Sequence, residues 1–159
     1  MSEIKLSRRI RLGMVGGGQG SLIGEAHRIA SRLDDKYEFC AGSLSSDPAR
    51  SMSSAKEIGL SLDRSYSDYT EMANSEAARD DGIDVVAVVT PNNTHYAIAK
   101  TFLEAGIHVI CDKPMTLTVE EADSLRETAK LNNKILAVTY NYTGYAMVRE
   151  AREIIARGD

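Results

Sequence analysis

Short apolar runs alternate along the chain with segments in which apolar residues recur at helical spacing. The runs predict six strands, at residues 10–15, 37–43, 64–66, 84–89, 108–111 and 134–139. The segments between and after them predict six helices, near residues 23–33, 48–58, 69–73, 94–105, 118–129 and 145–157. The run DVVAVV at 84–89 is apolar on both faces, as in a strand covered by helices on both sides. This alternation predicts an α/β fold with a doubly wound parallel sheet of about six strands.

Local signals mark where several of these helices begin and end. Asp47 is expected to cap the second helix, with Pro48 at the first helical position and Gly59 just past the end. Capping-box spacing marks two further helix starts, at 68–71 and at 118–121.

The bulk composition excludes several classes of protein. A net charge of −4 over 159 residues gives no reason to expect a nucleic-acid or anionic-membrane partner. The N-terminus has basic residues but no long apolar segment, so it is neither a signal peptide nor a membrane span. Cys40 and Cys111 lie in apolar runs and are expected as free thiols. We therefore expect a cytoplasmic protein.

Unusual residues gather just after the predicted strands. Glycines follow the first strand, serines the second, and the segments TPNNTH, DKP and YNYTGY follow three later strands. Because ligands of open parallel sheets bind at the carboxyl ends of the strands, we expect these segments to form one site.

The glycines after the first strand predict a phosphate-binding loop. Backbone N–H groups and a helix N-terminus bind phosphate where no side chain intervenes. The strict G-x-G-x-x-G spacing fails, because Ser21 occupies the third position; Gly16, Gly18 and Gly24 fit a lengthened loop that includes Gln19. A side chain at Gly18 would then obstruct the pyrophosphate. The alternative interpretation is a glycine-rich tight turn.

No carboxylate stands at the end of the second strand, where NAD-binding domains usually hold the ribose 2′-hydroxyl. Ser45 and Ser46 lie there, and Arg50 follows in the next helix. Hydroxyls and a guanidinium suit the 2′-phosphate of NADP better than the bare ribose of NAD, which gives a slight preference for NADP. The alternative is that the serines only precede the Asp47 cap and that Arg50 is solvated.

Three segments resemble one known family. GGGQGSLIGEAH, VVTPNNTHYAIAKTFLEAGIHVICDKPMTLTVEEADSL and MVREAREIIARGD are similar to the N-terminal domain of the glucose–fructose oxidoreductase/inositol dehydrogenase/MocA family. The most specific part is AGIHVICDKP, which matches the family pattern A-G-K-H-V-x-x-E-K-P. The resemblance implies an NAD(P)-binding Rossmann domain over residues 1–159, without the α/β substrate domain that follows it in the family. It also implies an NAD- or NADP-dependent oxidoreductase acting on sugars, polyols or related compounds, and a homo-oligomeric full-length protein.

The resemblance also assigns roles to residues. Lys113 is implied to lie near the nicotinamide and the substrate hydroxyl, and Asp112 stands where the family usually has Glu. The family's cofactor loop matches Thr90, Pro91, Asn92 and His95, and its loop facing nicotinamide and substrate matches Asn141 and Tyr142. Lys113 can donate a hydrogen bond to the reacting oxygen and so favour charge there. The alternative for Lys113 is a surface ion pair with Asp112.

Other functions stay open at this stage. The three histidines have no metal-ligand spacing, so no metal is expected; His27 and His108 are interpreted as structural. A non-catalytic dinucleotide-binding module or sensor is one alternative to the oxidoreductase. An S-adenosylmethionine methyltransferase is another, but the absent acidic residue after the second strand and the DKP segment count against it.

Overall fold

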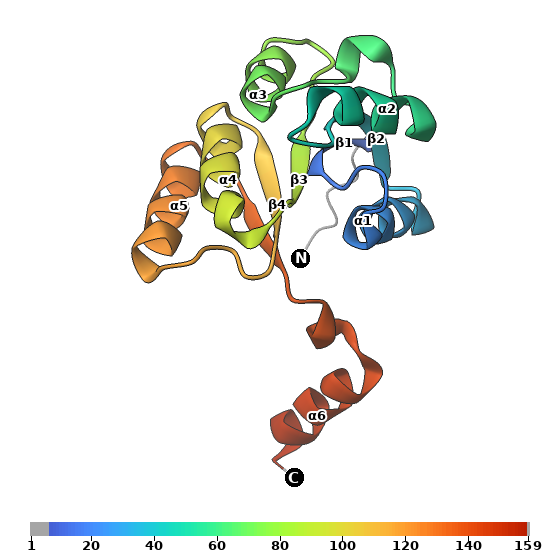
Figure 1. The fold of residues 1–159 in the computed structure, drawn as a ribbon. Coiled ribbons are helices and arrows are strands. Elements are labelled where there is room, and N and C mark those ends of the chain that lie inside the picture. The colour runs from blue at the N-terminus through green and yellow to red at the C-terminus, as the bar shows by residue number, and fades with distance from the viewer. Residues whose placement is uncertain (1–6, 159) are drawn as a thin grey trace.

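The computed structural model describes residues 7–158, and its centre is a parallel sheet with the strand order β2-β1-β3-β4-β5 (Figure 1). The strands are β1 (Ile10–Gly16), β2 (Tyr37–Ser43), β3 (Val85–Val89), β4 (His108–Asp112) and β5 (Leu136–Thr139). The predicted α/β class and parallel sheet are confirmed. The order reverses between β1 and β3, which is where open α/β sheets bind ligands.

Six α-helices connect or follow the strands, as predicted. They are α1 (Leu22–Leu33), α2 (Pro48–Ile58), α3 (Tyr69–Ala77), α4 (His95–Glu104), α5 (Val119–Leu131) and α6 (Ala146–Arg157). The Asp47 carboxylate caps α2 through the Arg50 N–H, and Gly59 ends that helix in the left-handed conformation. The Glu121 carboxylate accepts from the Leu117 N–H, one residue before the position that a capping box requires.

Two apolar clusters form the core, one on each face of the sheet. Strand residues that alternate along β1 and β3 divide between them, as the two-residue period of a strand requires. One cluster contains buried residues of α3, α4 and α5, such as Phe102 and Leu125. The other includes Ala55 of α2, and α1 covers the same face of the sheet beside Met14. Helices on both faces make the sheet doubly wound (Figure 1).

The strand predicted at 64–66 is wrong. Residues Leu62–Arg64 form a 3₁₀ helix, and Ser65 makes only an isolated parallel bridge to Gly42. The Arg64 guanidinium pairs with the buried Glu76 carboxylate, which also accepts from the Tyr66 hydroxyl at 2.8 Å. This buried polar pairing holds the segment in place of a strand ladder, so the sheet has five strands instead of about six.

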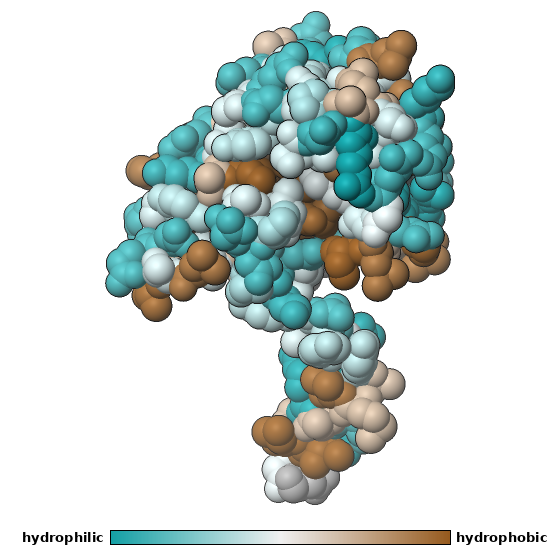
Figure 2. All heavy atoms as spheres, viewed as in Figure 1, coloured by the Kyte–Doolittle hydropathy of each residue, from teal (hydrophilic) through white to brown (hydrophobic). Residues whose placement is uncertain are grey.

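Helix α6 lies apart from the sheet (Figure 1). Each of its residues is exposed, including the apolar Met147, Val148, Ile154 and Ile155. Figure 2 shows hydrophobic side chains gathered on the lower part of the molecule, which is α6 in the same view of Figure 1. The helix therefore presents an apolar face to solvent in this chain.

Candidate dinucleotide-binding site

A cavity of about 710 Å³ opens at the carboxyl ends of β1, β2 and β3. It lies at the point where the strand order reverses. Eight residues predicted for the cofactor line it: Gly16, Gly18, Gln19, Ser45, Ser46, Arg50, Thr90 and Pro91. Segments that are far apart in the sequence therefore meet in one site.

The glycine loop joins β1 to α1 in the lengthened form that the sequence predicts. Gly16 and Gly17 have φ values of +81° and +75°, which L side chains rarely adopt, and Ser21 caps α1 through the Gly24 N–H. A Cβ added to Gly24 would lie only 2.3 Å from the Gly17 Cα. Gly24 therefore allows α1 to approach the loop, and it does not line the cavity.

The loop leaves some backbone donors free. The Gly18 N–H donates to the Leu44 carbonyl at 3.1 Å, and the Gln19 N–H donates to Ser54 Oγ at 3.0 Å. Within residues 7–158, no acceptor is found for the N–H groups of Gly20, Leu22 and Ile23. Free N–H groups at a helix N-terminus, together with the helix dipole, favour an anion there.

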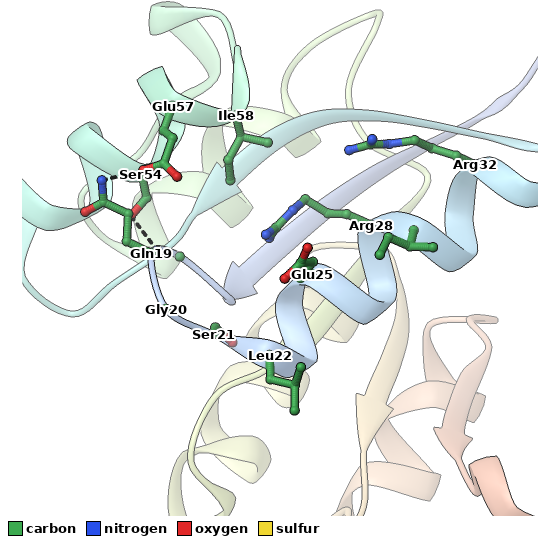
Figure 3. Close-up of a pocket in the computed structure, with 12 residues that line it drawn as sticks. Gln19, Gly20, Ser21, Leu22, Glu25, Arg28, Arg32, Ser54, Glu57 and Ile58 are labelled. Atoms are coloured by element: carbon green, nitrogen blue, oxygen red, sulfur yellow. Dashed lines mark hydrogen bonds between the residues drawn. The ribbon is translucent and has the colours of Figure 1, made fainter.

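Side chains connect the loop to α2. Gln19 Nε2 donates to Glu57 Oε2 at 2.6 Å, so the amide points toward α2, as Figure 3 shows. Arg50 Nη2 donates to the Gln19 carbonyl at 2.8 Å. A Cβ at Gly18 would lie 2.6 Å from Ser54 Oγ and 2.7 Å from the Leu44 carbonyl. A side chain at Gly18 would therefore collide with α2 and with the residue after β2, which is a different obstacle from the predicted one.

The residues after β2 lie at the edge of the cavity. Ser45 Oγ accepts from the Asp47 N–H at 3.1 Å, while Arg50 is held at the cavity by its bond to Gln19. A guanidinium has five N–H donors, so this bond leaves most of them available to a ligand.

His95 connects two of the predicted segments. Its ring is 1% exposed, with Nε2 at 2.8 Å from the Thr90 carbonyl and Nδ1 at 2.8 Å from the Pro114 carbonyl. His95 therefore supports the TPNNTH segment against the DKP segment from inside the protein. Asn92 is exposed and does not line the cavity, whereas Asn93 and Thr94 do.

Asp112 is held by two side chains at the end of β4. His27 Nε2 of α1 and Thr139 Oγ1 of β5 both donate to Asp112 Oδ1, at 2.9 and 2.6 Å. Burial acts to raise the pKa of the Asp112 carboxyl, but these hydrogen bonds outweigh it, and the pKa lies below its usual value. Sequence reasoning missed His27, whose contact with Asp112 joins residues far apart in the chain.

Lys113 is exposed, and its side chain has no hydrogen bond or ion pair within residues 7–158. The alternative of an ion pair with Asp112 is therefore not found. The Lys113–Pro114 peptide bond is cis. Asn141 and Tyr142 lie in the exposed 3₁₀ helix Asn141–Gly144 that follows β5, and they do not line the cavity.

Several residues that line the cavity were not predicted as site residues. They lie just before α3, at its first residue and in α4: Ser67, Asp68, Tyr69, Ala97 and Ile98. Asp68 was interpreted only as a helix cap, which it is, since its carboxylate accepts from Thr70 and Glu71 N–H groups. These residues reach the cavity because of the way α3 and α4 pack against the sheet, which local sequence signals do not reveal.

Across residues 7–158, no His, Cys, Asp and Glu side chains group in a way that could hold a metal ion. In the same range, no helix combines the length and the apolar character needed to cross a membrane. Both cysteines are free; burial raises the pKa of Cys40 to about 11 and that of Cys111 to about 12.

Residues 10–140 match the family model described as "Oxidoreductase family, NAD-binding Rossmann fold". The uncharacterized oxidoreductase YfiI of Bacillus subtilis strain 168 is 40% identical over 154 residues, which are 96% of this chain and 39% of that protein. Levoglucosan dehydrogenase of Pseudarthrobacter phenanthrenivorans is 29% identical over 95% of this chain and 38% of its own. An inositol dehydrogenase homologue from Azotobacter vinelandii, solved in complex with NAD⁺, superposes with a TM-score of 0.92 at 44% identity over 97% of this chain and 40% of that one. The chain thus spans about two fifths of the length of these proteins.

Proposed function

The chain belongs to the glucose–fructose oxidoreductase/inositol dehydrogenase/MocA family of oxidoreductases with an NAD-binding Rossmann fold, and from this premise we propose its function. It is the cofactor-binding domain of an enzyme that transfers hydride between a nicotinamide dinucleotide and a CH–OH group of a sugar or polyol. The observation that carries the proposal is the cavity at the β1–β3 reversal, which the glycine loop lines together with the segments that follow β2 and β3.

The cavity and the start of α1 beside it offer partners to the pyrophosphate and to the adenosine ribose of a dinucleotide. The N–H groups of Gly20, Leu22 and Ile23 are available to the pyrophosphate. Ser45 and Ser46 are available to the adenosine ribose, with Arg50 beside them. Thr90, which lines the cavity, and Lys113, which follows β4, would hold the nicotinamide.

Lys113 carries the chemistry that this chain contributes. The cofactor, when bound, supplies or accepts the hydride. A free ammonium in reach of the substrate oxygen stabilises negative charge there as hydride leaves or reaches the neighbouring carbon. The proton of the hydroxyl goes to another group, which we place in the part of the relatives beyond this chain. The printed names of the levoglucosan and inositol relatives support sugars or polyols as the substrate class.

The choice between NAD and NADP depends on Arg50. Its tether to Gln19 holds the guanidinium beside Ser45 and Ser46, with donors left for a 2′-phosphate. This supports the slight preference for NADP, whereas the NAD⁺ complex of the Azotobacter relative supports NAD. The choice is tested by measuring the affinities of wild type and Arg50→Ala for NADPH and for NADH. NADP is the cofactor if Arg50→Ala lowers the affinity for NADPH at least ten-fold and the affinity for NADH only slightly.

The test of the function titrates this chain with NADH, NADPH and S-adenosylmethionine. We expect a nicotinamide dinucleotide to bind, S-adenosylmethionine not to bind, and no sugar or polyol to be turned over by this chain alone. In a protein that also has the remainder found in the relatives, Lys113→Met should leave cofactor affinity nearly unchanged and lower the rate by orders of magnitude. Unchanged turnover in Lys113→Met would refute the role of Lys113, whereas cofactor binding without turnover in that longer protein would favour the alternative, a non-catalytic dinucleotide-binding module.

A further inference from the structure

Arg28 contacts the glycine loop but does not line the cavity described above; it lines a second cavity, between α1, α2 and the loop (Figure 3). Its Nη1 donates to the Gly17 carbonyl at 2.7 Å and lies 3.8 Å from Met14 Sδ. Figure 3 shows the side chain extending from α1 back toward the loop, while Arg32, one turn later, stays further from it. Arg28 is therefore a helix residue whose charged end reaches the backbone of the loop.

This cation is held without a carboxylate. No ion pair within 4.0 Å joins Arg28 to any carboxylate of residues 7–158. Burial lowers the pKa of the guanidinium, and the charge of Glu25 offsets only part of that effect. Burying part of a charge costs free energy unless the charged group is hydrogen-bonded. The hydrogen bond to the Gly17 carbonyl therefore offsets the cost of placing the Arg28 guanidinium here.

The same peptide unit is held at its other end. The Gly17 carbonyl and the Gly18 N–H belong to one planar peptide group, so they point in opposite directions. Arg28 donates to the oxygen, and the N–H donates to the Leu44 carbonyl at 3.1 Å. Arg28 and Leu44 together determine how this peptide is oriented, although both flanking residues are glycines with wide backbone freedom.

We propose that Arg28 is a positioning residue for the cofactor pyrophosphate, an inference that depends on the proposed role of the glycine loop. By fixing the Gly17–Gly18 peptide, Arg28 keeps the Gly17 carbonyl turned away from the anion. The fixed peptide also determines the backbone path of the residues that follow, including Gly20, Leu22 and Ile23, whose N–H groups are free. The charge of Arg28 lies next to the loop, at the Gly17 carbonyl, and attracts the pyrophosphate.

The experiment compares four forms of this chain: wild type, Arg28→Met, Arg28→Lys and Arg32→Met. Arg32→Met is the matched control, because it removes the same charge from the same helix at an exposed position. Each form is titrated with NADH, with ADP-ribose and with adenosine, which has no phosphate. Folding of each form is checked by circular dichroism and thermal unfolding.

Arg28→Met should weaken NADH and ADP-ribose at least ten-fold, because hydrogen bonds that involve charged groups have effects of this size. Adenosine affinity should stay within about two-fold, since adenosine binds beyond the reach of Arg28. Arg28→Lys should restore most of the affinity, because lysine keeps the charge and can donate to the Gly17 carbonyl. If Arg28→Met does not fold, Arg28→Gln replaces it, with a neutral donor and the same expected direction.

Two results would overturn the inference while the proposed function stands. One is equal NADH affinity in Arg28→Met and Arg32→Met. The other is a loss of adenosine affinity as large as the loss for ADP-ribose, which would mean that Arg28 supports the whole cavity. Failure of wild type to bind NADH would refute the proposed function itself, and this inference with it.

Discussion

Gly24 gives the sharpest test of the glycine loop. In Gly24→Ala the new Cβ would lie 2.3 Å from the Gly17 Cα and 2.4 Å from the Gly17 carbonyl oxygen. Ordinary contact begins at 3.4 Å, so α1 and the loop must separate by about 1.1 Å, and neither atom belongs to a side chain that could rotate away. Overpacking of this kind costs about 1–3 kcal/mol, while alanine regains about 0.5–1 kcal/mol of helix preference.

The effect on binding should exceed the effect on stability. If α1 retreats by about 1 Å, N–H···O distances of about 2.9 Å to a phosphate oxygen lengthen beyond the range of a hydrogen bond. The Leu22 and Ile23 donors are then lost, at about 1.5 kcal/mol or more each, which corresponds to roughly a hundred-fold weaker NADH binding. Fluorescence titration with NADH measures the affinity, and urea denaturation measures the free energy of unfolding.

Two other glycine-to-alanine variants separate the possible causes. At Gly144 nothing lies within 4 Å of an added Cβ, so Gly144→Ala should bind NADH like wild type. At Gly20 the φ is +77° and the nearest atom is 4.0 Å away, so Gly20→Ala tests backbone strain without a collision. NADH affinity in Gly24→Ala that equals that of Gly144→Ala would refute the close approach of α1 to the loop.

Two further predictions concern buried and half-buried carboxylates. Glu76→Gln removes the buried carboxylate of Arg64 and leaves only the exposed Asp81 at 3.7 Å, so it should lower the free energy of unfolding by about 3 kcal/mol in urea denaturation, whereas the exposed Glu71→Gln should change it little. The folded-state pKa of Asp112 lies below its unfolded value, so its carboxylate adds stability above the unfolded pKa and loses it as pH falls through the folded pKa. Asp112→Asn should therefore be less stable than wild type at pH 7, and the difference should shrink below about pH 4; a difference independent of pH would contradict this.

Local patterns predicted the elements because each helix and most strands carry their own signals. The apolar run at 84–89, the Asp47 cap and Gly59 each specify structure within a few residues. The strand predicted at 64–66 was wrong because the segment is only three residues long and Arg64 donates to the carboxylate of Glu76, twelve residues later. A pairing at that distance is decided by packing, and no periodicity reveals it.

Part of the candidate site could likewise be predicted from the sequence, and part could not. The sequence predicted that loops after β1, β2 and β3 meet, because parallel strands bring their carboxyl ends to one edge. It did not predict which side chains hold those loops, since such contacts cross between elements. His95 shows the difference: the family resemblance assigned it to the cofactor loop, whereas the structure places its two ring nitrogens 2.8 Å from carbonyls of two loops.

Helix α1 links the two halves of the proposed site through adjacent residues. Arg28 donates to the glycine loop at Gly17, and His27 donates to Asp112, which precedes Lys113. His27 and Arg28 are adjacent residues of one helix, so they move together. A shift of α1 that moves Arg28 relative to the glycine loop therefore also moves His27 relative to Asp112. Gly24 sets how closely α1 approaches that loop, so its replacement should disturb both contacts. Gly24→Ala should therefore change the environment of the His27 ring as well as NADH affinity, and an unchanged His27 NMR signal in a variant that has lost NADH would argue against this coupling.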